Sequence, residues 1–338
     1  MICVRNVSKS FDSTLALDGF GMTVRSGSIY GLVGTNGAGK TTILKMLAGV
    51  LKADGGDITI EDAPVYENEA VKSRLAFIPD DLSFYGKYAA KDLARLYGSL
   101  YRRWNGAMHS HIMAGFGLAM NIPLSRFSKG MQKQAAFALA LAAGPDYLLL
   151  DEPIDGLDPF VRRIVWNYIV GAKADMGMTT LVSSHNLREM DGICDSIGII
   201  DHGHMMLEKG LDELRADIHK VQVSFGSTAA LSGVAGGAYG GADAAADGAV
   251  GGGARGAGGA GAAGGSATPE GAYAKLNVVH MERRGAVDII IVRGSRETLE
   301  QWNDEYRPLL FDPIPLTMEE VFIYELGGAD HANYSIFE

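Results

Sequence analysis

The chain has 338 residues, of which 47% are hydrophobic, and its formal net charge is −10. This length accommodates one large domain with a buried core and a smaller module. The acidic balance argues against general nucleic-acid binding, which requires a basic surface that displaces counterions. The apolar runs are of strand length, far below the roughly 20 residues of a membrane span, and residues 1–11 lack the pattern of a signal peptide. We therefore expect a cytosolic chain that reaches a membrane only through a partner protein.

The N-terminal part alternates apolar and polar residues at 2–9 and 20–24, which predicts an antiparallel pair of strands. The apolar run SIYGLV leads into the loop GTNGAGKTT, residues 34–42, and then into ILKMLAGVL, which has a helical pattern. A strand, the pattern G-x-x-x-x-G-K-[ST] and a helix in this order are typical of a phosphate-binding loop. A mere glycine-rich turn is the weaker interpretation once both flanks are present.

The residue types of this loop suit the binding of a nucleoside triphosphate. The glycines let the backbone turn tightly and aim its N–H groups at phosphate oxygens. Lys40 can reach the β- and γ-phosphates, and Thr41 can offer its hydroxyl to Mg²⁺. The positive end of the following helix adds to the attraction. We expect ATP or GTP to be bound by Gly34, Thr35, Asn36, Gly37, Ala38, Gly39, Lys40, Thr41 and Thr42.

Strands and helices alternate after this loop. A hairpin and a short strand are predicted within 55–79, and helical spacing dominates from about 85 to 145. The runs YLLLDEP, TTLVSSH and SIGIIDHG are typical of strands, the first two buried on both faces, with a helix joining those two. This alternation predicts an α/β fold with a parallel sheet and a nucleotide at its carboxyl edge.

Two acidic residues end the strand YLLL. Asp151 can hold Mg²⁺ through water, and Glu152 is placed to polarise a water for in-line attack on the γ-phosphate. About 20 residues earlier, FSKGMQKQ opens an alanine-rich helix, where Ser128 can act as a cap and Gly130 permits close approach of an anion. Helix capping alone is the simpler interpretation of each pair, but their order after a phosphate loop favours a catalytic site.

The composition changes to glycine and alanine after about residue 226. Residues from about 227 to 272 lack the large apolar side chains that offset ordering entropy, so we predict a disordered insert. The runs on both sides of it are typical of strands of one small sheet. The helix PLTMEEVFIYEL would close that module, with Thr317 and Glu320 forming a capping box.

These motifs together resemble the ATP-binding subunit of an ABC transporter, which has a P-loop NTPase fold. The resemblance covers about residues 1–215, and the order of five motifs makes it specific. The matching segments are Gly34 to Thr42 (Walker A), Ser128 to Gln132 (signature), Tyr147 to Glu152 (Walker B), Ile154 to Pro159 (D-loop) and Ser184 with His185 (switch histidine). It implies an ATPase domain over 1–217 with a helical subdomain at about 82–145, followed by a small α/β module over 218–338.

The resemblance implies the head-to-tail dimer of this family, with two ATP molecules held between the protomers. Each site would take Walker A and Walker B from one chain, and Ser128 and Gly130 from the other. It also implies a Mg²⁺-dependent ATPase in which Glu152 activates water while His185 hydrogen-bonds the γ-phosphate and orients that water. Phe11 matches the aromatic residue that stacks on adenine, although ordinary core packing explains this residue equally well.

Two positions depart from the commonest pattern of the family. The signature has Phe127 and Lys129 where leucine and glycine are usual, and the added cation could contact either phosphate or the partner chain. Asp80 stands where the Q-loop glutamine is expected, and its carboxylate could still reach Mg²⁺ through water. An acidic Q-loop combined with SKGMQ and the closing helix resembles bacterial exporter-type ATPases whose membrane subunits are separate polypeptides.

The remaining histidines and the cysteines carry no site signal. His109, His111, His202 and His204 have loop-like spacing without partner cysteines, so we expect surface residues and no metal site. The two cysteines, Cys3 and Cys194, are expected to be buried packing residues in a reducing compartment.

The leading hypothesis is an ATPase at the cytoplasmic face of the membrane that powers export through separate permease subunits. Its second ATPase protomer would be another copy of the chain, and no nucleic acid would take part. Tyr85, Tyr88 and the segment YRRW offer aromatic and basic anchors for a helix of the membrane partner. The alternatives are a soluble ABC-type ATPase that acts on ribosomes or nucleic acid, and a regulatory protein that no longer hydrolyses ATP. The transported substrate is open.

Overall fold

The structure is a computed structural model that describes residues 1–82, 84, 88–226 and 269–325. The chain divides into two compact units. The first unit comprises Met1–Leu214 and the segment from Thr317 onward, and the second comprises Arg215–Leu316. In the described part of the chain, no helix combines the length and the apolarity needed to cross a bilayer.

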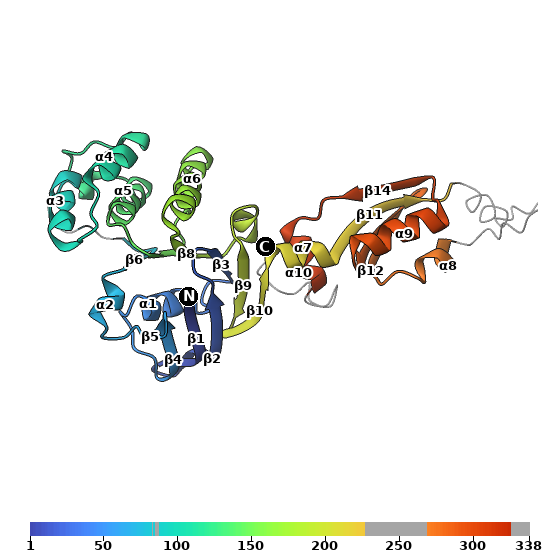
Figure 1. Ribbon diagram of the computed structural model, residues 1–338, viewed down its shortest axis with the longest axis horizontal. Coiled ribbons are helices and arrows are strands. Elements are labelled where there is room, and N and C mark those ends of the chain that lie inside the picture. Colours follow the sequence, from blue (N-terminus) through green and yellow to red (C-terminus); the bar gives the residue numbers. More distant parts are fainter. Residues whose placement is uncertain (83, 85–87, 227–268, 326–338) are drawn as a thin grey trace, which may run out of the picture. The chain divides into compact units, whose positions relative to one another are not determined.

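Two sheets form the framework of the first unit (Figure 1). The smaller sheet is antiparallel, in the order β2 (Thr14–Val24), β1 (Ile2–Phe11), β4 (Gly55–Ile60) and β5 (Ala63–Pro64). The larger sheet has the order β10 (His204–Gly210), β9 (Ser196–Asp201), β3 (Ile29–Val33), β8 (Thr179–Ser184), β7 (Tyr147–Asp151) and β6 (Leu75–Ile78). All of its strands run parallel except β10, which is antiparallel to β9. The predicted parallel sheet is therefore confirmed.

One hydrophobic core joins the two sheets through α1 (Lys40–Leu47), which begins directly after the phosphate loop. The apolar spacing of α1 buries Ile43, Leu44, Met46 and Leu47, as expected of an amphipathic helix with one face in a core. Every residue of β3 and β7 is buried, which explains their unbroken apolar runs. These two strands thus hold the phosphate loop and the acidic pair at the same edge of the sheet.

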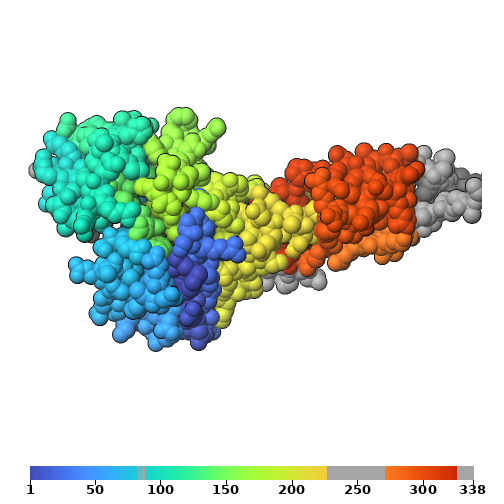
Figure 2. Space-filling view, in the orientation of Figure 1, coloured from blue at the N-terminus to red at the C-terminus, as the bar shows by residue number. Residues whose placement is uncertain are grey.

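The helical part of the first unit is built around α5 (Lys129–Ala142), which contacts α3 (Ala90–Leu100), α4 (Gly106–Gly115) and α6 (Pro159–Met176). Figure 2 shows the surface of this part in cyan to green. The alanines of α5 are buried, because small side chains let the neighbouring helices approach closely. Shorter elements complete the unit: α2 (Glu69–Lys72), η1 (Leu124–Arg126), η2 (Leu187–Met190) and the start of α7 (Leu211–Asp217).

Among the described residues, the second unit contains a four-stranded antiparallel sheet in the order β12, β13, β11 and β14, with two helices that lie wholly within the unit. Its described elements follow the order β-α-β-β-α-β, the arrangement called ferredoxin-like. A cluster of buried side chains that includes Tyr273, Ile290 and Trp302 forms its core. Its elements are β11 (Ile218–Ser224), α8 (Pro269–Tyr273), β12 (Val278–Arg284), β13 (Val287–Arg293), α9 (Arg296–Tyr306) and β14 (Leu310–Ile314).

The disordered insert predicted over about 227–272 extends too far at its C-terminal end. Residues 227–268 lie outside the described residues, but 269–272 belong to α8. Ala272 is buried, and its carbonyl accepts a hydrogen bond from Trp302 Nε1 at 2.8 Å. A short alanine-containing helix was indistinguishable from the preceding glycine- and alanine-rich sequence, because the ring that it packs against lies 30 residues away.

The helix predicted to close the C-terminal module belongs to the first unit instead. This helix, α10 (Met318–Glu325), contacts η2 and buries Met318, Val321 and Phe322. Its Glu319 accepts two hydrogen bonds from Arg188, at 2.7 and 2.9 Å. The capping box formed by Thr317 and Glu320 is confirmed. The sequence indicated where this helix begins, but not which unit it packs against.

One histidine prediction is wrong. His109, expected at the surface, is buried in α4, where its ring lies 5.3 Å from that of Trp104. Burial lowers the pKa of His109 below 6.5, since a low-dielectric site disfavours the imidazolium. The other three histidines of that group, His111, His202 and His204, are exposed as predicted. Both cysteines are free and buried, also as predicted.

We predict that in His109→Leu the free energy of unfolding depends less on pH below about 6.5 than in the wild type. Because the pKa of His109 is lower in the folded chain, the unfolded chain binds the proton more readily below pH 6.5. The free energy of unfolding therefore falls as the pH drops through this range, and the leucine variant lacks that fall. Urea unfolding at about pH 7.5 and 5.5 measures the difference. His111→Leu, an exposed residue of the same helix, is the control and should keep the wild-type profile; equal profiles for all three proteins would contradict the prediction.

Candidate active site

The phosphate loop follows a path that only glycine permits at two positions. At Gly34 an added Cβ would lie 2.3 Å from the carbonyl oxygen of Ile200. At Gly39, where φ is +112°, it would lie 2.8 Å from the carbonyl oxygen of Ala16. Contacts this short are not tolerated, and a positive φ strains any side chain. The loop is thereby pressed against the backbone of neighbouring segments, with its N–H groups at the start of α1.

Lys40 is buried within this loop. Its ammonium donates to the carbonyl oxygens of Gly34 and Thr35, at 2.6 and 3.1 Å. It also lies 3.3 Å from Oε1 of Glu152. The other predicted loop residues are present on the same turn: Asn36 and Gly37 are exposed, and Thr41 and Thr42 occupy the first turn of α1, with Thr41 exposed. The cation is therefore held among the main-chain oxygens of the loop and beside the Glu152 carboxylate, at the start of α1.

The acidic pair lies at the end of β7. Asp151 is buried, and its Oδ1 accepts a hydrogen bond from Ser183 at 2.7 Å. Its Oδ2 is buried and has no hydrogen-bond partner among the described residues. A buried carboxylate oxygen without a partner is costly unless a cation or water occupies the adjacent space. Oxygen ligands of this kind suit Mg²⁺, and the hydroxyl of Thr41 is a second candidate ligand.

Glu152 connects the acidic pair to the switch histidine. Its carboxylate Oε2 lies 2.9 Å from Nδ1 of His185, at the end of β8. Its main-chain N–H donates to Ser183 Oγ at 3.1 Å, and its φ is +47°. The structure therefore brings together Lys40, the adjacent pair Asp151 and Glu152, and His185, which come from three separate segments. A carboxylate between an ammonium and an imidazole can accept a proton from a water and hold its position while doing so.

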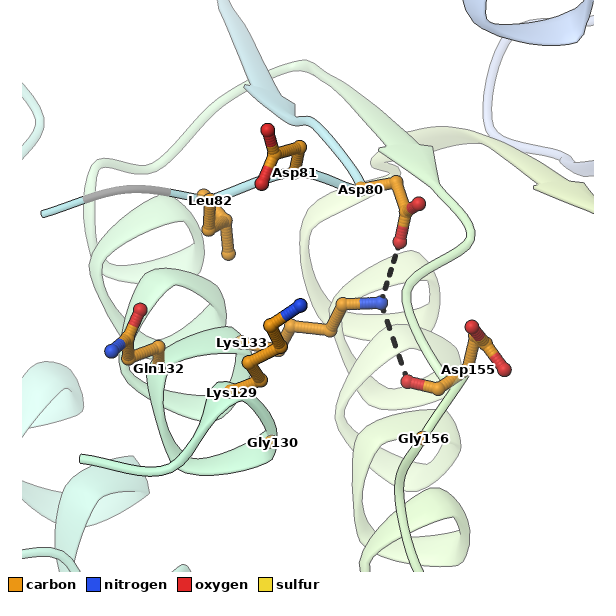
Figure 3. Close-up of a pocket in the computed structure, with 9 residues that line it drawn as sticks. All are labelled: Asp80, Asp81, Leu82, Lys129, Gly130, Gln132, Lys133, Asp155 and Gly156. Carbon is orange, nitrogen blue, oxygen red and sulfur yellow. Dashed lines mark hydrogen bonds and ion pairs between the residues drawn. The ribbon is translucent and has the colours of Figure 1, made fainter.

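The signature residues lie on another part of the first unit. Ser128 is the N-cap of α5, and its hydroxyl accepts a hydrogen bond from the N–H of Met131 at 3.3 Å. Gly130 and Lys129 line a cavity of about 350 Å³ with Asp80 and Asp155 (Figure 3). None of the described residues that line it belongs to the phosphate loop. Ser128 and Gly130 therefore remain candidates for a site that a second chain completes.

Two expectations change with the geometry. Asp80, expected to approach Mg²⁺ through water, has its Oδ1 2.8 Å from Nζ of Lys133. Lys133 was not singled out from the sequence, because nothing in the spacing shows that α5 meets the segment after β6.

Phe11 is 43% exposed at the end of β1, with Lys9 Nζ 5.6 Å from its ring centroid. Core packing is therefore wrong for Phe11, and stacking on adenine stays a prediction.

Comparison with known proteins agrees with this arrangement. Residues 17–155 match the family described as ABC transporter. The chain is 26% identical over 328 residues to the ABC transporter ATP-binding protein YtrB of Bacillus subtilis (strain 168), an alignment that covers 97% of this chain and 99% of YtrB. It is 32% identical over 210 residues to the Nod factor export ATP-binding protein I of Burkholderia lata, covering 60% of this chain and 69% of that protein.

A solved structure shares the fold. The dimeric structure of MJ0796, a bacterial ABC transporter cassette, superposes with a TM-score of 0.58 at 20% identity. The superposition covers 62% of this chain and 99% of the cassette.

Proposed function

Because the chain belongs to the ATP-binding proteins of the ABC transporter family, an ATPase family, we propose that it hydrolyses ATP with Mg²⁺ as a dimer and thereby powers export. The membrane-spanning part would be separate permease subunits. The observation that carries the hydrolytic role is the position of the Glu152 carboxylate, 3.3 Å from Lys40 and 2.9 Å from His185. These groups surround the place where a γ-phosphate bound to the loop would meet a water.

Each of these side chains has a part in the reaction. Lys40 would move from the loop carbonyls to the phosphate oxygens, where its charge stabilises the transferred group. Glu152 takes a proton from the attacking water, and His185 keeps the carboxylate aligned. Asp151 and Thr41 would hold Mg²⁺, which neutralises charge on the phosphates when bound. Phe11, exposed at the end of β1 in the small sheet, would cover the base.

The dimer is supported by the separation of two half-sites within one chain. Gly130 lines the cavity at the start of α5 and Ser128 caps that helix, whereas Lys40 and Glu152 lie at the sheet edge. Two copies arranged head to tail would place the first half-site of one chain against the second half-site of the other. The MJ0796 cassette has been solved as a dimeric structure, which fits this arrangement.

Export and a membrane partner are supported by a relative and by the surface of the helical part. The Burkholderia protein is named for Nod factor export. Tyr88, which precedes α3, is 60% exposed and suits contact with a partner helix. Tyr85, the other predicted tyrosine anchor, lies outside the described residues. In the segment YRRW, Arg102 and Arg103 are exposed, while Trp104 packs against Tyr97 at 5.9 Å. We place the complex at the cytoplasmic face of the membrane.

Affinity purification from detergent-solubilised membranes tests this function. We expect a polytopic membrane protein to co-elute in a fixed ratio, and the complex to hydrolyse ATP only when Mg²⁺ is present. A Lys40→Ala variant should recover the same membrane protein without hydrolysis, which separates assembly from catalysis. Recovery with ribosomes or nucleic acid, and without any membrane protein, would contradict the proposal and favour the soluble alternative.

A further inference from the structure

One lysine joins three segments of the first unit that are distant in sequence (Figure 3). Lys133, in the second turn of α5, donates to Oδ1 of Asp80 at 2.8 Å. It also donates to the main-chain carbonyl oxygens of Glu152, at 2.9 Å, and Asp155, at 3.3 Å. An ammonium has three N–H donors, and each of them has one of these acceptors. All three N–H donors of the Lys133 ammonium thus have an acceptor within the protein.

The ammonium of Lys133 depends on these three hydrogen bonds because its side chain is largely shielded from water. The Lys133 side chain is 11% exposed, whereas that of Asp80 is 50% exposed. A shielded ammonium is stable only where hydrogen bonds and an opposite charge replace its water. Asp80 supplies the charge from the solvent side, and the two carbonyl groups supply the remaining acceptors. The lysine therefore cannot leave without freeing the backbone that it holds.

The backbone of Glu152 needs such a restraint. Its φ of +47° is uncommon for a residue with a side chain. A conformation of this kind persists only where the surroundings determine it. Its N–H donates to Ser183 Oγ, and its carbonyl oxygen accepts from Lys133 Nζ at 2.9 Å and from the N–H of Asp155 at 3.3 Å. The direction of the Glu152 carboxylate toward His185 depends on this backbone, so it depends on these bonds, of which the one from Lys133 is the shorter at the carbonyl.

We propose that Lys133 is a positioning residue for hydrolysis, and that Asp80 serves as its counter-ion rather than as a contact to Mg²⁺. The inference rests on the proposed function, because the position of Glu152 matters only if Glu152 acts on water. It accounts for the carboxylate at a position where glutamine is usual: a neutral amide would leave the charge of Lys133 uncompensated.

Removing the ammonium tests the positioning role. Lys133→Met should lower kcat by about 10- to 100-fold, as a small displacement of a reacting group does. The affinity for ATP, measured by calorimetry, should stay within about twofold, because the phosphate loop is untouched. Lys133→Arg keeps the charge and several donors, so it should restore part of kcat. Lys91→Met, an exposed lysine of α3, is the matched control for loss of charge and should change neither quantity.

If Lys133 had a purely structural role, Lys133→Met would lower both the amount of folded protein and the binding of ATP. It would then not lower kcat while leaving the affinity for ATP unchanged. Thermal unfolding of each variant shows which fraction is folded. A kcat of folded Lys133→Met within twofold of the wild type overturns the inference. If the methionine variant does not fold, Lys133→Gln takes its place, because glutamine keeps a polar side chain of similar length. A kcat of folded Lys133→Gln within twofold of the wild type then overturns the inference.

Asp80→Asn distinguishes the counter-ion from a metal contact. As a counter-ion, Asp80 loses its effect on kcat once Lys133 is methionine, so the double variant should match Lys133→Met. The Mg²⁺ concentration that gives half-maximal activity should be the same in all four proteins. A higher Mg²⁺ requirement in both Asp80→Asn backgrounds would overturn this assignment. If the wild type itself lacks Mg²⁺-dependent turnover, the proposed function fails, whereas an active wild type with an unaffected Lys133 variant refutes only the inference.

Discussion

Replacing Glu152 by glutamine is expected to lower steady-state turnover of ATP by about 100- to 10,000-fold, while ATP still binds. Glutamine keeps the size of the side chain but cannot accept a proton from water. The 3.3 Å approach of Oε1 to Lys40 adds a second effect. Without the carboxylate, Lys40 is free to turn to the phosphate, so the affinity for ATP should be equal or higher. Both effects together predict a variant that holds ATP without cleaving it.

Size-exclusion chromatography with ATP and Mg²⁺ provides a second reading of the same variant. If two chains enclose the nucleotide, Glu152→Gln should accumulate as a dimer, since cleavage no longer reopens it. Glu69→Gln, an exposed residue of α2, is the control and should keep both wild-type turnover and the wild-type elution profile. Unchanged ATPase activity in Glu152→Gln would show that another group activates the water.

The second large effect is expected from Gly34→Ala. The new methyl group would lie 2.3 Å from the carbonyl oxygen of Ile200 and 2.8 Å from its Cγ2, so the loop or β9 must shift. Insertions into a packed site typically cost about 1–3 kcal/mol. If that cost falls on the binding-competent loop, the affinity for ATP drops by roughly 5- to 150-fold.

Calorimetric titration with ATP and Mg²⁺ measures this loss, and thermal unfolding shows whether the fold survives. Gly171→Ala is the matched control, because its added Cβ meets no atom within 4 Å. That site lies inside α6, where alanine is favoured over glycine, so this variant should bind ATP normally and unfold at an equal or higher temperature. Normal ATP affinity in Gly34→Ala would show that the loop tolerates the displacement.

The sequence predicted the parts of the molecule whose signals are local. A strand, a glycine-rich loop and a helix follow one another in the chain, so the phosphate loop and Lys40 were identified before any contact was known. The unbroken apolar runs that end at Asp151 and His185 indicated buried parallel strands, and the structure contains them. The resemblance placed both Glu152 and His185 beside the γ-phosphate, and in the structure Nδ1 of His185 lies 2.9 Å from Glu152.

Features that depend on contacts between distant segments were missed. Lys133 is one polar residue in the first turns of an alanine-rich helix, and only the approach of Asp80 shows why it is there. His109 carries a polar ring but is buried against Trp104. The capping box indicated where α10 begins, yet only its contacts in the first unit, such as that of Glu319 with Arg188, show the unit to which it belongs. Each case requires a partner that hydrophobic periodicity does not identify.

The return of the chain to the first unit at Thr317 has a consequence for biosynthesis. Translation delivers Met1–Leu214 first, but the helix that packs beside the turn after His185 is made only after the second unit. The second unit must therefore emerge before the nucleotide-binding unit has all its parts. During that interval the apolar surface that later receives Val321 and Phe322 stays uncovered, and nascent chains are prone to aggregate through such surfaces.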